Sequence, residues 1–208
     1  TKDQSYVLYD MDQNSFSRTI FPLGKLTKTK TRQIAKQLGL SVADKKDSQE
    51  ICFVEDNNYG RFISENIPDS IKPGPILDKE GNQMGMHRGI VYYTVGQRKG
   101  LGIPFGKPFY IIKIDQENNA IIVGEEKDTF SKELFADQVI WTSIASPNKP
   151  FSAKAKIRYQ SPEEDAKIFP ISETSIQIKF KKPVRSITPG QSVVIYNKNV
   201  VLGGGVIR

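Results

Sequence analysis

From about Lys127 to the C-terminus, the sequence is a succession of short apolar segments separated by turn residues. Short segments with turn signals between them are typical of β-strands in an all-β domain. We expect these strands at 138–141, 153–159, 166–170, 175–180, 192–196 and 200–207. Five or six strands of this length fit a small closed barrel, so the sequence predicts an all-β C-terminal domain.

The chain before Lys127 mixes helical and strand patterns. A helix is expected after Thr27, a good N-cap residue, and before Gly39, which suits the position after a helix end. A second short helix is expected at 59–67, where Pro68 stops it. Strands are expected at 76–78, from Met84 onward, at 91–95, and in a hairpin of 110–115 with 121–124. The predicted fold class is α+β, with a small mixed α/β domain followed by the barrel.

The composition excludes several classes of protein. The 208 residues contain one Cys, which rules out an internal disulfide and fits a reducing, cytoplasmic setting. One His and one Cys cannot form a Cys/His zinc site, and no loop has the ligand spacing for a hard cation. No apolar run is long enough to span a bilayer, so no membrane partner is expected.

The positive charge is unevenly distributed. The formal net charge is +7, and residues 25–46 hold seven basic side chains and one acid, Asp44. Residues 151–208 hold ten basic side chains and four acidic ones. Clusters of this kind suit a polyanionic partner such as a nucleic acid, although a solvated basic surface has the same composition.

The glycine-rich segment 94–107 matches no nucleotide-binding pattern. It departs from the phosphate loop and from the dinucleotide fingerprint in the spacing of its glycines. We therefore expect no ATP or NAD site in this chain. The segment is either an RNA-contacting loop, with charge from Arg98 and Lys99, or a simple turn.

Three positions are candidates for chemistry or binding. Cys52 is either a sulfur carrier or a buried residue of a strand at 51–54. His87 is expected to be a structural turn residue or an RNA contact rather than a catalytic base. Arg158 and Tyr159 end the strand expected at 153–159, which presents either an RNA-binding ladder or the solvent face of an edge strand.

Seven segments match one known family in order and spacing. They are Lys2-Asp3-Gln4-Ser5-Tyr6, Phe21-Pro22-Leu23-Gly24, Asp47-Ser48-Gln49-Glu50-Ile51-Cys52-Phe53, Thr94-Val95-Gly96-Gln97-Arg98-Lys99-Gly100-Leu101, Lys156-Ile157-Arg158-Tyr159, Pro189-Gly190-Gln191 and Leu202-Gly203-Gly204-Gly205-Val206-Ile207. Through them the chain resembles the tRNA-specific 2-thiouridylases over essentially its whole length.

The resemblance implies a division into domains. Residues 1–17 would be a linker from a missing N-terminal domain, 18–126 a central tRNA-binding domain with the persulfide cysteine, and 127–208 the C-terminal barrel. ATP, together with Mg²⁺, would bind the missing domain, so no cofactor or metal site is expected in this chain. The chain alone is expected to be inactive.

The resemblance also implies a reaction, the formation of 2-thiouridine at the wobble position of tRNA. The C2 oxygen of the uridine is activated as an adenylate, and sulfur carried as a persulfide on Cys52 replaces it. The implied partners are tRNA, a persulfide sulfur-donor protein and the missing N-terminal domain.

The family's tRNA contacts fall on six residues of this sequence, namely Lys2, Asp3, Gln4, Arg158, Tyr159 and Gln191. One departure lies beside the cysteine, where Glu50 replaces a usual glycine and opposes thiolate formation. A different class of function stays open: a stand-alone RNA-binding adaptor of translation in which Cys52 is structural.

Overall fold

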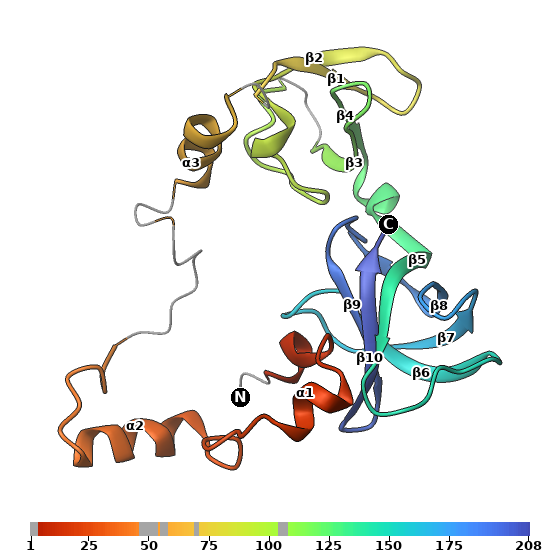
Figure 1. Ribbon diagram of the computed structural model, residues 1–208. Coiled ribbons are helices and arrows are strands. Elements are labelled where there is room, and N and C mark those ends of the chain that lie inside the picture. Colours follow the sequence, from red (N-terminus) through yellow and green to blue (C-terminus); the bar gives the residue numbers. More distant parts are fainter. Residues whose placement is uncertain (1–3, 46–53, 55–57, 69–70, 104–107) are drawn as a thin grey trace.

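The computed structural model describes residues 4–45, 54, 58–68, 71–103 and 108–208. Short helices occupy the first third of the chain, a four-stranded sheet follows, and a closed six-stranded barrel ends it (Figure 1). The predicted α+β fold with a C-terminal barrel is therefore confirmed.

The barrel closes in the order β10-β5-β8-β7-β6-β9, with every neighbouring pair antiparallel. Its strands are β5 (Phe130–Trp141), β6 (Phe151–Lys156), β7 (Glu164–Pro170), β8 (Ile176–Arg185), β9 (Ser192–Asn197) and β10 (Val200–Ile207). Alternate residues point inward, and Ile168, Ile178 and Ile195 are fully buried in the core. The short apolar segments separated by turns, from which the barrel was predicted, correspond to these strands.

Two barrel strands are longer than the sequence predicted. β5 begins at Phe130 rather than at 138, and β8 continues past Phe180 to Arg185. Pro183 lies inside β8, and proline normally argues against an inner strand because it has no N–H to donate. The β5–β8 register shifts between Ser131 and Glu133, and this irregularity in the pairing accommodates the proline.

A third strand is shorter than predicted. β6 ends at Lys156, and the chain then turns, with Ser161 N–H donating to the Arg158 carbonyl at 3.1 Å. Arg158 and Tyr159 therefore lie in a turn rather than at the end of a strand. β6 is hydrogen-bonded to both β7 and β9, so this segment is not an edge strand, which was one of its two interpretations.

The smaller sheet has the order β2-β1-β4-β3, in which β1 and β4 are parallel and the other pairs antiparallel. Its strands are β1 (Gly74–Leu77), β2 (Gln83–His87), β3 (Tyr110–Asp115) and β4 (Ala120–Gly124), and the predicted β3–β4 hairpin is confirmed. Its core includes the buried side chains Ile76, Ile111 and Ile121.

The prediction of a strand at 91–95 is wrong. The 3-10 helix η3 (Ile90–Tyr92) begins this segment, and a turn follows it. Gly96 has φ +88°, outside the extended region, so the chain contacts β3 only around Ile111 and then leaves it. A short run of apolar residues does not by itself distinguish a strand from a short helix followed by a turn, which explains the wrong prediction.

His87 has a structural role at the end of β2, one of the two roles expected from sequence. Its side chain is 1% exposed, and Nδ1 accepts from the Gly89 N–H at 3.1 Å. Nε2 therefore carries the proton and donates to the Asn119 carbonyl at 2.9 Å. The ring thus ties β2 to the β3–β4 turn.

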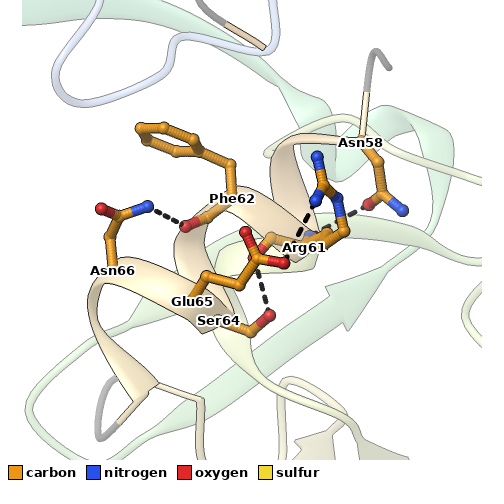
Figure 2. A network of polar contacts seen from close by, with 6 residues as sticks. All are labelled: Asn58, Arg61, Phe62, Ser64, Glu65 and Asn66. Atoms are coloured by element: carbon orange, nitrogen blue, oxygen red, sulfur yellow. Dashed lines mark hydrogen bonds and ion pairs between the residues drawn. The ribbon is translucent and has the colours of Figure 1, made fainter. Parts of the chain in front are cut away.

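Both predicted helices are present. α2 (Lys28–Gln37) is capped by Thr27, whose hydroxyl accepts from Lys30 N–H, and Gly39 follows it with φ +68°. α3 (Tyr59–Asn66) is held by the contacts that Figure 2 shows, including the Asn58 cap on Arg61 N–H at 3.0 Å and the Arg61–Glu65 ion pair at 3.2 Å.

The N-terminal segment lies on the outside of the barrel. It comprises the 3-10 helix η1 (Ser5–Leu8) and α1 (Gln13–Ser17), which Figure 1 shows beside β9 and β10. The Tyr9 ring packs directly on Gly204 of β10. A Cβ at Gly204 would come within 2.5 Å of that ring and 2.6 Å of the Val193 carbonyl. A glycine here is thus required by the close approach of the N-terminal segment.

We predict that Gly204→Ala destabilises the protein by about 1–3 kcal/mol, because the added methyl group overpacks a site bounded partly by backbone. Gly85→Ala in β2 is the matched control, since its added Cβ meets nothing nearer than 3.9 Å. Thermal unfolding of the two variants tests this. Equal melting temperatures would contradict the proposed docking of Tyr9.

Candidate nucleic-acid interface

The predicted contacts Gln4 and Tyr159 meet directly. The Gln4 side-chain amide donates to the Tyr159 hydroxyl at 3.2 Å, although the two residues are far apart in sequence. Tyr6 lies under this pair, with its ring edge-on to Tyr159 at 6.0 Å between centroids. The N-terminal segment and the turn after β6 therefore form one surface.

Tyr6 anchors that surface to the barrel. It is 8% exposed and packs on Val194 and Tyr196 of β9, and its hydroxyl donates to the Ser192 carbonyl at 2.7 Å. Burial raises the pKa of Tyr6 from 10.0 to about 12, with smaller contributions from Tyr9 and Tyr196. Arg158 acts in the opposite direction. Tyr6 is therefore a protonated hydrogen-bond donor over the ordinary pH range.

Lys156 adds positive charge to this aromatic surface. Its ammonium group lies 5.8 Å from the ring centres of both Tyr6 and Tyr159. A cation beside an aromatic face is a usual arrangement where a protein binds the phosphates and bases of RNA. Lys156 belongs to the segment 153–159, for which an RNA-binding ladder was one of two interpretations. Tyr6 was not among the predicted contacts, although it belongs to a matching segment of the sequence.

Arg158 points into the structure and joins the barrel to the preceding sheet. Its Nη2 donates to the Thr188 hydroxyl at 2.7 Å, to the Ser186 carbonyl at 2.9 Å and to the Val95 carbonyl at 3.4 Å. Gly96 contacts Ser186 at the same junction, where a Cβ would approach the Ser186 hydroxyl to 2.2 Å. Arg158 is therefore first of all a bridge between the two parts of the chain.

Gln191 lies in the next turn, before β9. Its backbone N–H donates to the Thr188 carbonyl at 3.2 Å, and its side chain is exposed. Arg158 donates to the hydroxyl of the same Thr188. Thr188 therefore connects the turn that contains Gln191 with the turn that carries Tyr159. The structure thus brings Gln4, Arg158, Tyr159 and Gln191 to neighbouring positions. Lys2, Asp3 and Cys52 lie outside the described residues.

A cavity of about 700 Å³ opens beside Arg158 at this end of the barrel. Its apolar wall includes Phe130, Ile157 and Phe180, and Glu164 and Arg185 add charged groups. The Arg98–Lys99 turn follows Gly96 in sequence, and both of its side chains are exposed. Of the predicted contacts, Arg158 therefore borders the cavity, together with Gly96.

The described part of the chain has neither a metal-ligating cluster nor a membrane-spanning helix. No group of three or more His, Cys, Asp or Glu side chains in these residues is arranged to hold a metal ion. None of the helices described is long and apolar enough to cross a membrane.

Three family models match consecutive parts of the chain. The model described as the tRNA methyl transferase HUP domain matches residues 1–56, the tRNA methyl transferase PRC-barrel domain matches 60–125, and the aminomethyltransferase beta-barrel domain matches 131–207. Together the three models match most of the chain, and they place it in the class of proteins that these domain models describe. The domain division at 17 and 126 stays a prediction.

Close relatives narrow the assignment. The tRNA-specific 2-thiouridylases MnmA of Halothermothrix orenii and Acetivibrio thermocellus are 50% and 51% identical over 207 residues, and that of Clostridium beijerinckii is 46% identical. Each alignment covers 100% of this chain and 58% of the relative. The chain belongs to the tRNA-specific 2-thiouridylase family and spans a little over half the length of these relatives.

The raised pKa of Tyr6 predicts a pH dependence. Below pH 10 the Tyr6 phenol is protonated in both the folded and the unfolded states, so Tyr6 contributes no pH dependence of stability there. Between pH 10 and about 12 only the unfolded state loses the proton, so Tyr6 lowers the stability progressively. We expect a steeper loss of stability from pH 9.5 to 11.5 in the unmodified protein than in Tyr6→Phe, measured by urea unfolding. Parallel curves would contradict this account of Tyr6.

We predict that Arg158→Lys lowers stability by about 1–2 kcal/mol, because an ammonium group on a shorter stem cannot reach all three acceptors. Arg98→Lys, at an exposed position in the adjoining turn, is the matched control and should be neutral. The measurement is the urea midpoint of each variant. An unchanged midpoint for Arg158→Lys would show that the bridge contributes nothing to stability.

Proposed function

We propose that this chain is the tRNA-binding and sulfur-carrying part of an enzyme that makes 2-thiouridine at the wobble uridine of tRNA. The observation that carries the proposal is the direct contact of Gln4 with Tyr159 beside Lys156, in a chain of this family. Gln191 lies in a turn that Thr188 connects to Arg158, the neighbour of Tyr159. Because Gln4 and Tyr159 are far apart in sequence, their contact depends on the fold.

The chemistry of this surface supports RNA as the ligand. The side chains of Gln4 and Gln191 are exposed amides that can donate to and accept from base edges or sugar hydroxyls. Lys156 supplies a cation for a phosphate, and the half-buried ring of Tyr159 supplies a stacking face. Tyr6 and Arg158 contribute by holding this surface in place.

In this proposal Cys52 carries the sulfur as a persulfide. Its terminal sulfur attacks C2 of the uridine and forms the new carbon–sulfur bond, and the activated oxygen leaves with AMP. A cysteine thiolate outside this chain then attacks the Cys52 sulfur, so the thiocarbonyl is released and a disulfide remains. The two electrons that reduce the transferred sulfur come from this thiol pair. ATP supplies the activation at C2, and we assign its binding to residues outside this chain.

The test of tRNA recognition compares unmodified glutamate tRNA with a DNA duplex of equal charge. We expect the chain to prefer tRNA, and Tyr159→Ala to weaken tRNA binding about tenfold through the loss of stacking. Gln191→Ala should weaken it about threefold to tenfold. Gln83→Ala, an exposed glutamine on β2, is the control and should have no effect. Equal affinity for tRNA and DNA, lost together as salt is raised, would refute recognition by this surface.

Sulfur loading is tested separately. The chain is incubated with a persulfide donor protein, and the mass of one added sulfur atom is sought on the Cys52 peptide. Cys52→Ser should abolish loading and leave tRNA affinity unchanged. Loading that fails while tRNA binding succeeds would favour an RNA-binding role without sulfur transfer.

A further inference from the structure

Five of the six lysines in β6, β7 and β8 are adjacent to a buried residue in their strand, and we call the outer surface that they form the lysine face. They are Lys154, Lys156, Lys167, Lys179 and Lys181. Neighbouring residues in each strand point into the barrel, where Ala155, Ile168 and Ile178 are buried. Strand alternation thus directs every one of these lysines to the outside, and no requirement of the core explains the choice of lysine.

Two of the lysines oppose each other directly. Lys167 of β7 is paired in register with Lys179 of β8. Like charges at directly opposite positions of a sheet repel each other and lower stability. A hollow of about 350 Å³ lies over the same three strands, lined by Lys167, Lys179 and Lys181 together with Asp165. The repulsion is therefore concentrated around a depression in the surface.

Few acidic groups neutralise this face. Asp165 is its one carboxylate among the described outward residues of β6, β7 and β8, and it is paired in register with Lys154. Lys179 lies 3.9 Å from Glu133 of β5, and both side chains are about half exposed. In the described part of the chain, no carboxylate lies within ion-pair distance of Lys154, Lys156, Lys167 or Lys181. Most of the positive charge is thus available to a partner.

An aromatic ring lies among the cations. The half-buried ring of Phe169 on β7 has the ammonium groups of Lys167 and Lys179 at 5.4 and 5.6 Å from its centre. The same combination of lysine and aromatic ring occurs at Lys156 and Tyr159, at the end of β6. Because Lys154 and Lys156 lie on the same side of β6, the lysine face is continuous with the surface that holds Gln4 and Tyr159.

We propose that the lysine face binds the phosphate backbone of tRNA and extends the interface from Tyr159 across the outside of the barrel. This inference rests on the proposed function, since it takes tRNA as the polyanion. Neighbouring outward residues are about 5 Å apart between strands and about 7 Å apart along a strand, so the lysines form a grid that meets several phosphates at once. Contacts of this kind position the RNA without reading its sequence.

The main test uses the triple variant Lys154→Gln/Lys167→Gln/Lys181→Gln. We expect its affinity for tRNA to fall at least tenfold at low salt. The slope of log affinity against log salt should become shallower by about 2, since each phosphate contact contributes about 0.7–0.9. The control triple Lys72→Gln/Lys113→Gln/Lys198→Gln removes the same charge from exposed positions elsewhere. An equal loss in both triples would show an effect of net charge alone and would overturn the proposal.

The single variant Lys167→Gln separates binding from folding. Relief of the repulsion with Lys179 should leave the melting temperature unchanged or raise it by about 1 °C, while tRNA affinity falls twofold to fivefold. A lower melting temperature with unchanged affinity would show a structural role and refute the proposal.

The proposed function and the lysine face fail in different ways. If Tyr159→Ala weakens tRNA binding and the lysine triple variant does not, the proposal for the lysine face is refuted and the proposed tRNA interface around Tyr159 stands. If the unmodified chain binds no tRNA, both proposals are refuted. If the lysine triple loses binding to vesicles of anionic lipid but not to tRNA, the face is a membrane-binding surface and the proposal is overturned.

Discussion

Closure of the six-stranded barrel is the constraint on which the rest of the structure depends. Each strand is hydrogen-bonded on both sides, so the barrel has no free edge for a partner strand. The inward positions are taken by apolar residues such as Ile178 and Ile195, whose burial stabilises the fold. A partner can therefore reach only the outward side chains and the ends of the barrel. The tyrosines and lysines occupy those places.

Two partly buried polar connections join other segments of the chain to this barrel. Tyr6 holds the N-terminal segment against β9, and Arg158 holds the Val95 segment against the loop that contains Ser186 and Thr188. Each is a donor whose loss would leave an acceptor without its partner, which makes the connection costly to break. The exposed amide of Gln4 then reaches Tyr159 because its neighbours in sequence are fixed. Structural and RNA-facing roles are thus divided between adjacent residues.

Local sequence patterns predicted most of the fold and little of the geometry of the site. The barrel follows from short apolar segments with turns between them, and the helix after Thr27 follows from its capping residues. Both signals need only nearby residues. The long form of β8 was missed because Pro183 is tolerated only through a register shift with β5. The direction of the Arg158 side chain depends on acceptors in another loop, for which the sequence holds no signal. The role of Tyr6 had a weak signal, an aromatic residue within a matching segment.

The most direct measurement of the central claim is photo-crosslinking of 4-thiouridine-substituted tRNA to the chain, with the linked peptides mapped by mass spectrometry. The account predicts crosslinks at the turn with Tyr159, at the turn with Gln191 and on the outward residues of β6 and β7. Crosslinks confined to the β1–β4 sheet, with none on the barrel, would contradict the claim that the barrel is the tRNA-binding surface.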